Sequence, residues 1–388
     1  LYKGEILELS KDHKIVFASN PIEFGGGRNE QKLFTDKRIQ QINLKSMPRK
    51  YIEYLLVRDI LNKAGGIQKP SQEAFLESLK DRIDFYIENL GTKKEITVRE
   101  LQQDALRKMV RYNKNQIRYK ELETNNFTST KVTKALEEEI LEIINIIKLQ
   151  KTGNLPSLGT PGILLEGLSG IGKSVMLEAY LQTYLPDSYI KVSASDSLEE
   201  KKKLIGKAYE QGKVILIDEL DTAIDDGLEK ILNLALSGKH PDESKQESID
   251  NGALKIIPGF ALFASSNGIT MDGRRVISEA IRHRISCPEV DGAITYDQED
   301  IKTIINSWLD EKAKLTDKSE RKISEIASAY QELGQEQSSL NLRELKQYCQ
   351  QQEGLREIMK NQKVSIKPID SGRLASSTQH NVKEAVAI

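Results

Sequence analysis

Four short apolar runs alternate with longer mixed segments in the middle of the chain. The runs are Ile163–Leu165, Tyr189–Ser193, Val214–Ile217 and Phe260–Ala264. Short runs rich in aliphatic, β-branched and aromatic residues predict buried strands, and the segments between them predict helices. Strands that alternate with helices favour a parallel sheet, so we expect a three-layer α/β core.

Amphipathic patterns flank these runs on both sides. Between Leu136 and Ile147 the apolar residues recur at helical spacing, which predicts a helix packed against the sheet. A second helical pattern begins near Asp297 and continues as a helical bundle to about Arg356. We interpret Trp308, in the first helix of that bundle, as a core anchor rather than a substrate-binding aromatic residue.

Polar segments separate the predicted elements. Residues 116–130 lack periodicity and predict a linker, and residues 366–388 predict a flexible tail because they are mostly polar and Ser-rich. Residues 239–258 are polar and then apolar. They leave two interpretations open, a hairpin inserted before the fourth run or a loose loop.

Composition excludes several classes of protein. The 388 residues carry 57 basic and 58 acidic side chains, so the overall charge gives no argument for a nucleic-acid partner. The two cysteines, Cys287 and Cys349, lack metal-binding spacing. No apolar run is long enough to span a membrane and no secretory signal is evident, so we expect a cytoplasmic protein without a membrane partner. A chain that opens at Leu1 suggests a fragment or a processed product.

The segment GLSGIGKS after the first run fits the phosphate-binding pattern G-x-x-x-x-G-K-[ST]. A strand, a glycine loop and a helix place backbone N–H groups and a helix dipole around an anion. The alternative is a glycine turn that precedes a lysine by chance, with a probability of roughly 1%. The predicted nucleotide-binding residues are Gly167, Ser169, Gly170, Ile171, Gly172, Lys173, Ser174 and Val175. Lys173 would reach the β- and γ-phosphates of ATP, and the Ser174 hydroxyl would ligate Mg²⁺.

Two carboxylates follow the third run directly. Asp218 would hold Mg²⁺ through water, and Glu219 would orient and deprotonate the attacking water. The alternative is a buried strand that ends in a solvated turn. The separation of 45 residues from Lys173 (218 − 173) favours the catalytic interpretation.

Asn267 follows the fourth run. Ligand chemistry gathers at the carboxyl ends of parallel strands, so we expect Asn267 beside Glu219 and the γ-phosphate. Its amide can donate to a phosphate oxygen and accept from the attacking water. The alternative is an ordinary turn residue.

Together these motifs resemble the AAA+ ATPase family, whose members combine a P-loop NTPase core with a helical lid. The resemblance implies that Arg343, in LNLREL, is the lid arginine that senses the nucleotide. It also implies a finger arginine in the segment AIRHRI that completes a neighbour's site, and we favour Arg284 over Arg282. Either could instead be an ordinary surface ion-pair residue. In the family the segment around Val132 borders the adenine.

The N-terminal part of the chain repeats some of these signals. The sequence IVFASN ends at Asn20, and Arg38 lies 18 residues later (38 − 20), against 17 for Asn267 and Arg284 (284 − 267). Arg99, in ITVREL, lies 79 residues after Asn20 (99 − 20), against 76 for the second set (343 − 267). Three matches in register predict a partial first module that lacks its phosphate loop. The alternative is an unrelated helical adaptor.

The resemblance gives five expected parts. They are residues 1–115, the C-terminal half of a first AAA+ module; 116–130, a linker; 131–290, the α/β core of a second module; 291–365, its helical lid; and 366–388, a tail. The segment from Asn20 to Arg28 and the sequence DELD resemble the dynein and midasin branch, and the latter also resembles MoxR-type chaperones. One departure is that only about 20 residues separate the second and third strands, which leaves little room for the helix insertion of that branch.

The resemblance implies an ATPase that uses ATP and Mg²⁺, releases ADP and remodels protein partners by core–lid motion. Its other partners would be neighbouring AAA+ modules, in the same chain or in an oligomer. Because a finger arginine must come from a neighbour, we expect weak hydrolysis by the isolated chain. Two alternatives stay open: a regulatory or scaffolding module with a structural nucleotide, and, with less support, a nucleic-acid translocase.

Overall fold

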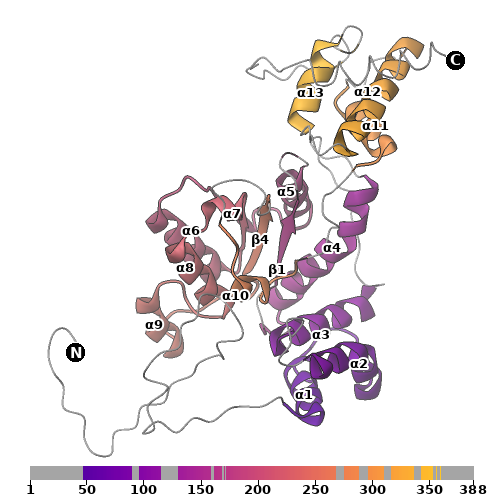
Figure 1. Ribbon diagram of the computed structural model, residues 1–388. Helices are drawn as coiled ribbons and strands as arrows, with labels where there is room; N and C mark the ends of the chain where they lie inside the picture. Colours follow the sequence, from indigo (N-terminus) through magenta and orange to yellow (C-terminus); the bar gives the residue numbers. More distant parts are fainter. Residues whose placement is uncertain are drawn as a thin grey trace, which may run out of the picture.

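The computed structural model shows a helical unit, an α/β core and a second helical group along the chain (Figure 1). The described residues are 47–89, 96–114, 130–158, 161–167, 170, 172–267, 275–287, 296–309, 316–335, 342–352, 355 and 359. The repeat signals at Asn20 and Arg38, the predicted linker apart from Thr130, and the predicted tail lie outside these residues.

The core is built on a four-stranded parallel sheet. Its strands are β1 (Gly162–Glu166), β2 (Tyr189–Val192), β3 (Val214–Ile217) and β4 (Ala261–Ser266), in the order β1-β4-β3-β2. Beyond β1, Ser286 forms an isolated parallel bridge with Ile163, so backbone pairing continues past the edge strand on that side. All four strands predicted from the apolar runs are therefore confirmed, and with them the α/β fold class.

Alternate side chains of the strands enter two separate cores, as the pleat of a strand requires. Ile163 and Leu165 face one cluster, together with helices α4 (Lys131–Lys151) and α5 (Lys173–Tyr184). Leu164 faces the opposite cluster. There the sheet is covered by α6 (Leu198–Gln211), α7 (Leu220–Ala223), α8 (Asp226–Leu236) and α10 (Glu279–Arg282). The sheet is thus the middle layer of three, as Figure 1 shows.

The sheet needs glycine where α6 turns into β3. Gly212 ends α6 with φ +59°, a left-handed conformation that glycine adopts without steric cost. A Cβ atom at this position would lie 2.2 Å from the carbonyl oxygen of Pro258. The chain that leads to β4 therefore passes directly over the start of β3.

Residues 239–258 contain no strand, so the hairpin interpretation is wrong. They form a 3₁₀ turn (Glu243–Lys245) and the short helix α9 (Gln246–Asp250). His240 is buried under this segment, where its ring contacts the Glu210 carboxylate at 3.1 Å. This anchor ties the start of the segment to α6 and explains why it is not a free loop.

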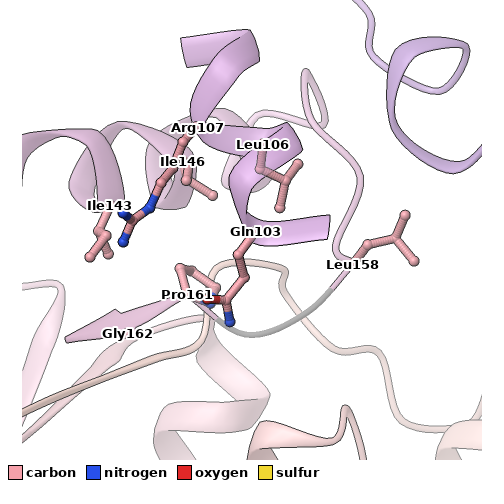
Figure 2. A pocket seen from close by; sticks show the side chains of 8 residues that line it. All are labelled: Gln103, Leu106, Arg107, Ile143, Ile146, Leu158, Pro161 and Gly162. Atoms are coloured by element: carbon pink, nitrogen blue, oxygen red, sulfur yellow. The ribbon is translucent and has the colours of Figure 1, made fainter. Parts of the chain in front are cut away.

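The N-terminal helices form a unit with its own core. They are α1 (Arg49–Leu56), the π-helical segment η3 (Val57–Leu61), α2 (Gln72–Glu88) and α3 (Val98–Tyr112). Their buried side chains cluster with Ile146 of α4, which joins the unit to the core. Figure 2 shows α3 and α4 against the start of β1, where a cavity of ≈ 10 Å³ remains between them. This space holds about one water molecule at most.

Ion pairs fix α3 along α4. Arg107 contacts Glu139 at 2.8 Å, and Lys114 contacts Glu138 at 2.9 Å. Between them Arg111 binds Glu142, which is buried and only 3% exposed. A buried carboxylate must be paired, so this arrangement specifies how α3 lies on α4.

The C-terminal helical group consists of α11 (Gln298–Ser307), α12 (Asp317–Gln335) and α13 (Leu342–Gln351), and we use the name lid for these three helices. Asp297 is the N-cap of α11, and the helix begins near Asp297 as predicted. Trp308 is partly buried against the apolar cluster, and the Lys346 ammonium lies 5.6 Å from its ring centroid. Trp308 thus packs in the lid core as predicted. Within the described part of the chain, none of the helices combines the length and apolarity that crossing a bilayer requires.

Candidate nucleotide site

The candidate site lies at the carboxyl edge of the sheet. After β1 the chain crosses to the far edge of the sheet to form β2, and β3 and β4 then return toward β1. The order of the strands therefore reverses next to β1. In open parallel sheets, ligands bind outside the strand ends at such a switch point. The register pairs Glu166 of β1 with Ser266 of β4 and aligns Ile217 of β3 with Ala264 of β4. The loops after β1, β3 and β4 therefore meet at one edge.

The candidate phosphate loop, residues 167–174, follows β1 and leads into α5. Gly170 has φ +75° and Gly172 has φ +90°, conformations that favour glycine at both positions. Gly172 is also the N-cap of α5, so the positive end of this helix faces the loop. Val175 lies in the first turn of α5 and is exposed. Two other predicted loop residues, Ser169 and Ile171, lie outside the described residues.

Lys173 is buried and points back into the loop. Its ammonium donates to the Gly167 carbonyl at 3.0 Å and to the Asn267 side-chain oxygen at 2.9 Å. Only 5% of its surface is exposed. A buried ammonium held by neutral oxygens is a site where an anion can replace or join those partners.

Ser174, Asp218 and Ser265 form a hydrogen-bonded group beside Lys173. The Ser174 hydroxyl donates to the Asp218 carboxylate, and the Ser265 hydroxyl donates to the same oxygen at 2.6 Å. Burial alone would raise the pKa of Asp218, but these hydrogen bonds outweigh it and hold the pKa below its usual value. Asp218 is therefore an ionised carboxylate next to a hydroxyl oxygen.

This donor set fits Mg²⁺. Carboxylate and hydroxyl oxygens are hard ligands, and Mg²⁺ commonly binds to one or two protein groups together with water and substrate phosphates. Within the described part of the chain no cluster of three or more His, Cys, Asp and Glu residues could hold a metal ion by itself. Ser174 and Asp218 would thus hold the ion together with phosphate oxygens rather than as a protein cage.

Glu219 has an unusual backbone conformation. Its φ is +52°, which is sparsely populated for a residue with a side chain and costs of order 1–3 kcal/mol. The conformation is stabilised by a hydrogen bond from the Glu219 N–H to the Ser265 hydroxyl, at 3.1 Å. The Asn267 amide donates to the Glu219 carboxylate at 3.4 Å. Asn267 therefore lies beside Glu219, as its position after β4 predicts, and it also contacts Lys173.

Two residues of this group were not predicted from the sequence. Ser265 contacts both Asp218 and Ser174, and its hydroxyl also accepts from the Glu219 N–H. Asp221 is buried and accepts a hydrogen bond from the Asn267 N–H at 3.2 Å. Asp221 could have been noticed because it lies three residues after Asp218, at the start of a helical turn. Its hydrogen-bond partner, the Asn267 backbone, could not be inferred from the spacing.

The lid contacts the phosphate loop directly. The backbone N–H of Leu342, the first residue of α13, donates to the Gly170 carbonyl at 3.0 Å. A Cβ atom at Gly172 would meet Tyr296 and Leu342 at 3.9 and 4.0 Å, so both lie beside the loop. Arg343 is placed at this junction, but its side chain is exposed and has no hydrogen bond or ion pair with a described residue.

The two finger candidates have different surroundings. Arg282 forms a two-pronged ion pair with Glu166, with both N–O distances at 2.7 Å. Arg284 donates from one terminal nitrogen to the Asn233 side chain at 2.9 Å, and its Nε is buried without a hydrogen-bond partner among the described residues. Burial, and then the positive charge of Arg99, lower the pKa of Arg284. Arg282 is therefore engaged within the core, whereas Arg284 lies near a second cation.

The strand order, the glycine loop before α5 and the carboxylates after β3 together decide the assignment. The core has the α/β fold that is typical of P-loop NTPases. The cavity in Figure 2 lies at the start of β1, at the opposite end of this strand from the phosphate loop, and is no part of the candidate site.

Comparison with known proteins finds similarity only to solved structures. No protein-family model matches the chain, and no curated protein matches it. Among solved structures, the Thermotoga maritima RuvB Holliday junction branch migration motor is 14% identical, with 64% of this chain and 68% of that chain covered and a TM-score of 0.36. A point mutant of the same RuvB protein is 15% identical, with coverages of 68% and 73% and a TM-score of 0.39. The FIGL-1 AAA domain is 15% identical, with coverages of 66% and 87% and a TM-score of 0.32. The P-loop NTPase assignment itself rests on the sheet order and the loop.

Proposed function

We propose that the chain binds ATP with Mg²⁺ and hydrolyses it as an AAA+ module. The observation that carries this proposal is the convergence of Lys173, Asp218, Glu219 and Asn267 at one edge of the sheet. Their proximity supports the roles that we propose for them in phosphoryl transfer.

The phosphate loop would bind the triphosphate through backbone N–H groups and the Lys173 ammonium. Lys173 would exchange its contact with the Gly167 carbonyl for phosphate oxygens, since charge-assisted hydrogen bonds are the stronger ones. Ser174 and Asp218 would hold Mg²⁺, which when bound neutralises charge on the β- and γ-phosphates.

Glu219 would act on the attacking water. Its backbone conformation directs it to the strand edge beside Asn267, and the amide of Asn267 would orient the water and a γ-phosphate oxygen. Asp221 supports this geometry because its carboxylate binds the Asn267 backbone N–H.

The lid would respond to the state of the nucleotide. Leu342 is bonded to the phosphate loop, so a change in the loop would act on the start of α13. We propose that Arg343, the residue after Leu342, turns toward the γ-phosphate when ATP is bound. Release of the phosphate would then change the angle between the core and the lid. This motion would remodel a protein partner.

Arg284 would serve a neighbouring site rather than its own. Arg284, in the segment after α10, lies close enough to Arg99 of α3 for the two positive charges to repel each other. An anion bound between the two arginines would reduce this repulsion. This supports the proposal that residues 1–115 are the end of a preceding AAA+ module whose nucleotide lies between these arginines. The expected division into a second core at 131–290 and its lid at 291–365 belongs to the same proposal, as does the resemblance to the dynein and midasin branch.

The test is the substitution Glu219→Gln. This variant keeps the shape of the side chain but lacks the base, so it should bind ATP as the wild type does and lose turnover by at least about 10²-fold. ATP binding by fluorescence titration and phosphate release under single-turnover conditions measure the two effects separately. Unchanged turnover would reject Glu219 as the base. Binding without any phosphate release by the wild type, even with neighbouring modules present, would instead support the scaffolding alternative.

A further inference from the structure

Glu166 places a negative charge directly before the phosphate loop. It is the last residue of β1, and the next residue, Gly167, accepts the hydrogen bond from the Lys173 ammonium. Its side chain is about one third exposed, at 33%, so the charge is only partly screened by solvent. A carboxylate at this point is unfavourable for a loop that must hold a triphosphate, because like charges repel.

Arg282 covers this charge. Its two terminal nitrogens each donate to a different Glu166 oxygen at 2.7 Å, and its Nε donates to the Ile277 carbonyl at 3.2 Å. The hydrogen bonds to Glu166 also raise the pKa of Arg282. The guanidinium is thus fixed from both sides, with its charge held against Glu166.

We propose that Arg282 neutralises the Glu166 carboxylate and so prevents it from repelling the triphosphate in the phosphate loop. This inference rests on the proposed ATP binding. Arg282 acts through Glu166 and touches no substrate, which makes it a positioning residue. It also explains why Arg282 and Arg284, two residues apart, serve different sites.

The proposal differs from a purely structural role in the sign of its effects. If the ion pair only held β1 to α10, then removing either partner would weaken ATP binding in the same direction. If Arg282 neutralises Glu166, the two substitutions have opposite effects, because one leaves a negative charge beside the phosphates and the other leaves a positive one.

The experiment measures the ATP dissociation constant of four forms of the full chain: wild type, Arg282→Gln, Glu166→Gln and the double variant. Arg282→Gln should raise the constant on the order of tenfold at low salt. Glu166→Gln should leave it unchanged or lower it, and the double variant should return close to wild type. The effect of Arg282→Gln should shrink as ionic strength rises, because added salt screens partly exposed charges.

Controls keep the result interpretable. Arg82 and Asp104 form a partly exposed ion pair, at 2.7 Å, in the N-terminal unit, so Arg82→Gln and Asp104→Asn should not change ATP binding. Arg282→Lys retains the charge without the two-pronged geometry and should bind ATP nearly as wild type does. This variant tests the proposal if Arg282→Gln fails to fold.

The outcomes separate this inference from the proposed function. Failure of the wild type to bind ATP would overturn the proposed function itself. Normal binding by the wild type, together with equal losses in Arg282→Gln and Glu166→Gln that salt does not alter, would overturn the neutralising role alone. A loss in Arg282→Lys as large as in Arg282→Gln would also overturn it.

Discussion

At the scale of single residues, the site depends on one serine as much as on the predicted carboxylates. Ser265 donates to Asp218 and accepts from the Glu219 N–H, so it fixes both residues after β3 relative to β4. The left-handed conformation of Glu219 is held by this contact. Strain of this kind persists only where neighbouring groups determine it, and it is concentrated at functional sites.

A second residue-scale feature makes the junction with α3 dependent on pH. His283 lies 3.2 Å from the Glu100 carboxylate, which raises the pKa of His283. Burial alone would raise the pKa of Glu100, but hydrogen bonds from His283 and Thr97 hold it below its usual value. Glu279 also faces the ring, at 3.6 Å, and Arg284 opposes its charge.

The sign of this dependence follows from the two shifts. A raised histidine pKa contributes stability that is fully present below the unfolded value near 6.5 and is lost as pH rises through the folded pKa. The lowered Glu100 pKa contributes stability that is fully present above the unfolded value of about 4.5 and is lost as pH falls through the folded pKa. His283→Gln should therefore cost about 0.5 kcal/mol at pH 6, because the ring is partly exposed, and less at pH 8.5.

Chemical denaturation of wild type and His283→Gln at both pH values measures this difference. Lys114→Gln is the control, because its ion pair with Glu138 involves no group that titrates between these pH values. A cost that is the same at pH 6 and pH 8.5 would show that His283 acts without its charge.

At the scale of elements, the strands and their loops were predictable because local sequence determines them. β3 and β4 are buried apolar runs, and Asp218, Glu219 and Asn267 follow them directly, so the meeting of strand ends places these residues together. The pair Arg282–Glu166 was not predictable, because it joins residues 116 positions apart. The hairpin interpretation of residues 239–258 failed because burial of His240, a tertiary contact, decides that segment.

The turn between α6 and β3 gives a prediction at this scale. Gly212→Ala combines a left-handed backbone with a Cβ atom 2.2 Å from the Pro258 carbonyl oxygen, so it should destabilise the chain by about 3 kcal/mol or more. Gly238 has a similar φ of +76° but open space around it, so Gly238→Ala should cost only about 1 kcal/mol. Thermal and denaturant unfolding of the two variants compares them. Equal losses of unfolding free energy in the two variants would mean that the segment before β4 moves away from residue 212 without cost.

At the scale of the whole molecule, α4 connects the three parts of the chain (Figure 1). At its start, Lys131 donates from its backbone N–H to Asp300 of the lid at 2.8 Å, and its ammonium contacts Asp297 at 2.6 Å. Further along, Glu139 and Glu142 bind the arginines of α3. One continuous helix therefore contacts both the lid and the N-terminal helices.

This arrangement predicts which segments bound nucleotide protects from amide hydrogen exchange. In Glu219→Gln, ATP should slow amide hydrogen exchange in the phosphate loop and at the start of α13, because Leu342 donates to Gly170. The start of α4 should be protected as well, whereas α1 should not change. Hydrogen exchange measured with and without ATP tests this pattern. Protection of the loop alone would show that the lid does not sense the nucleotide.

We expect a triphosphate to bind between the end of β1 and the start of α5, with Lys173 as its cationic partner. The most direct measurement is a calorimetric titration of the full chain with ATP and Mg²⁺, for wild type and for Lys173→Ala. We expect saturable binding of one ATP by the wild type and an affinity lower by about 10²-fold or more in Lys173→Ala, since a charge-assisted contact is removed from a buried site. Equal affinities, or no binding by the folded wild type, would contradict it.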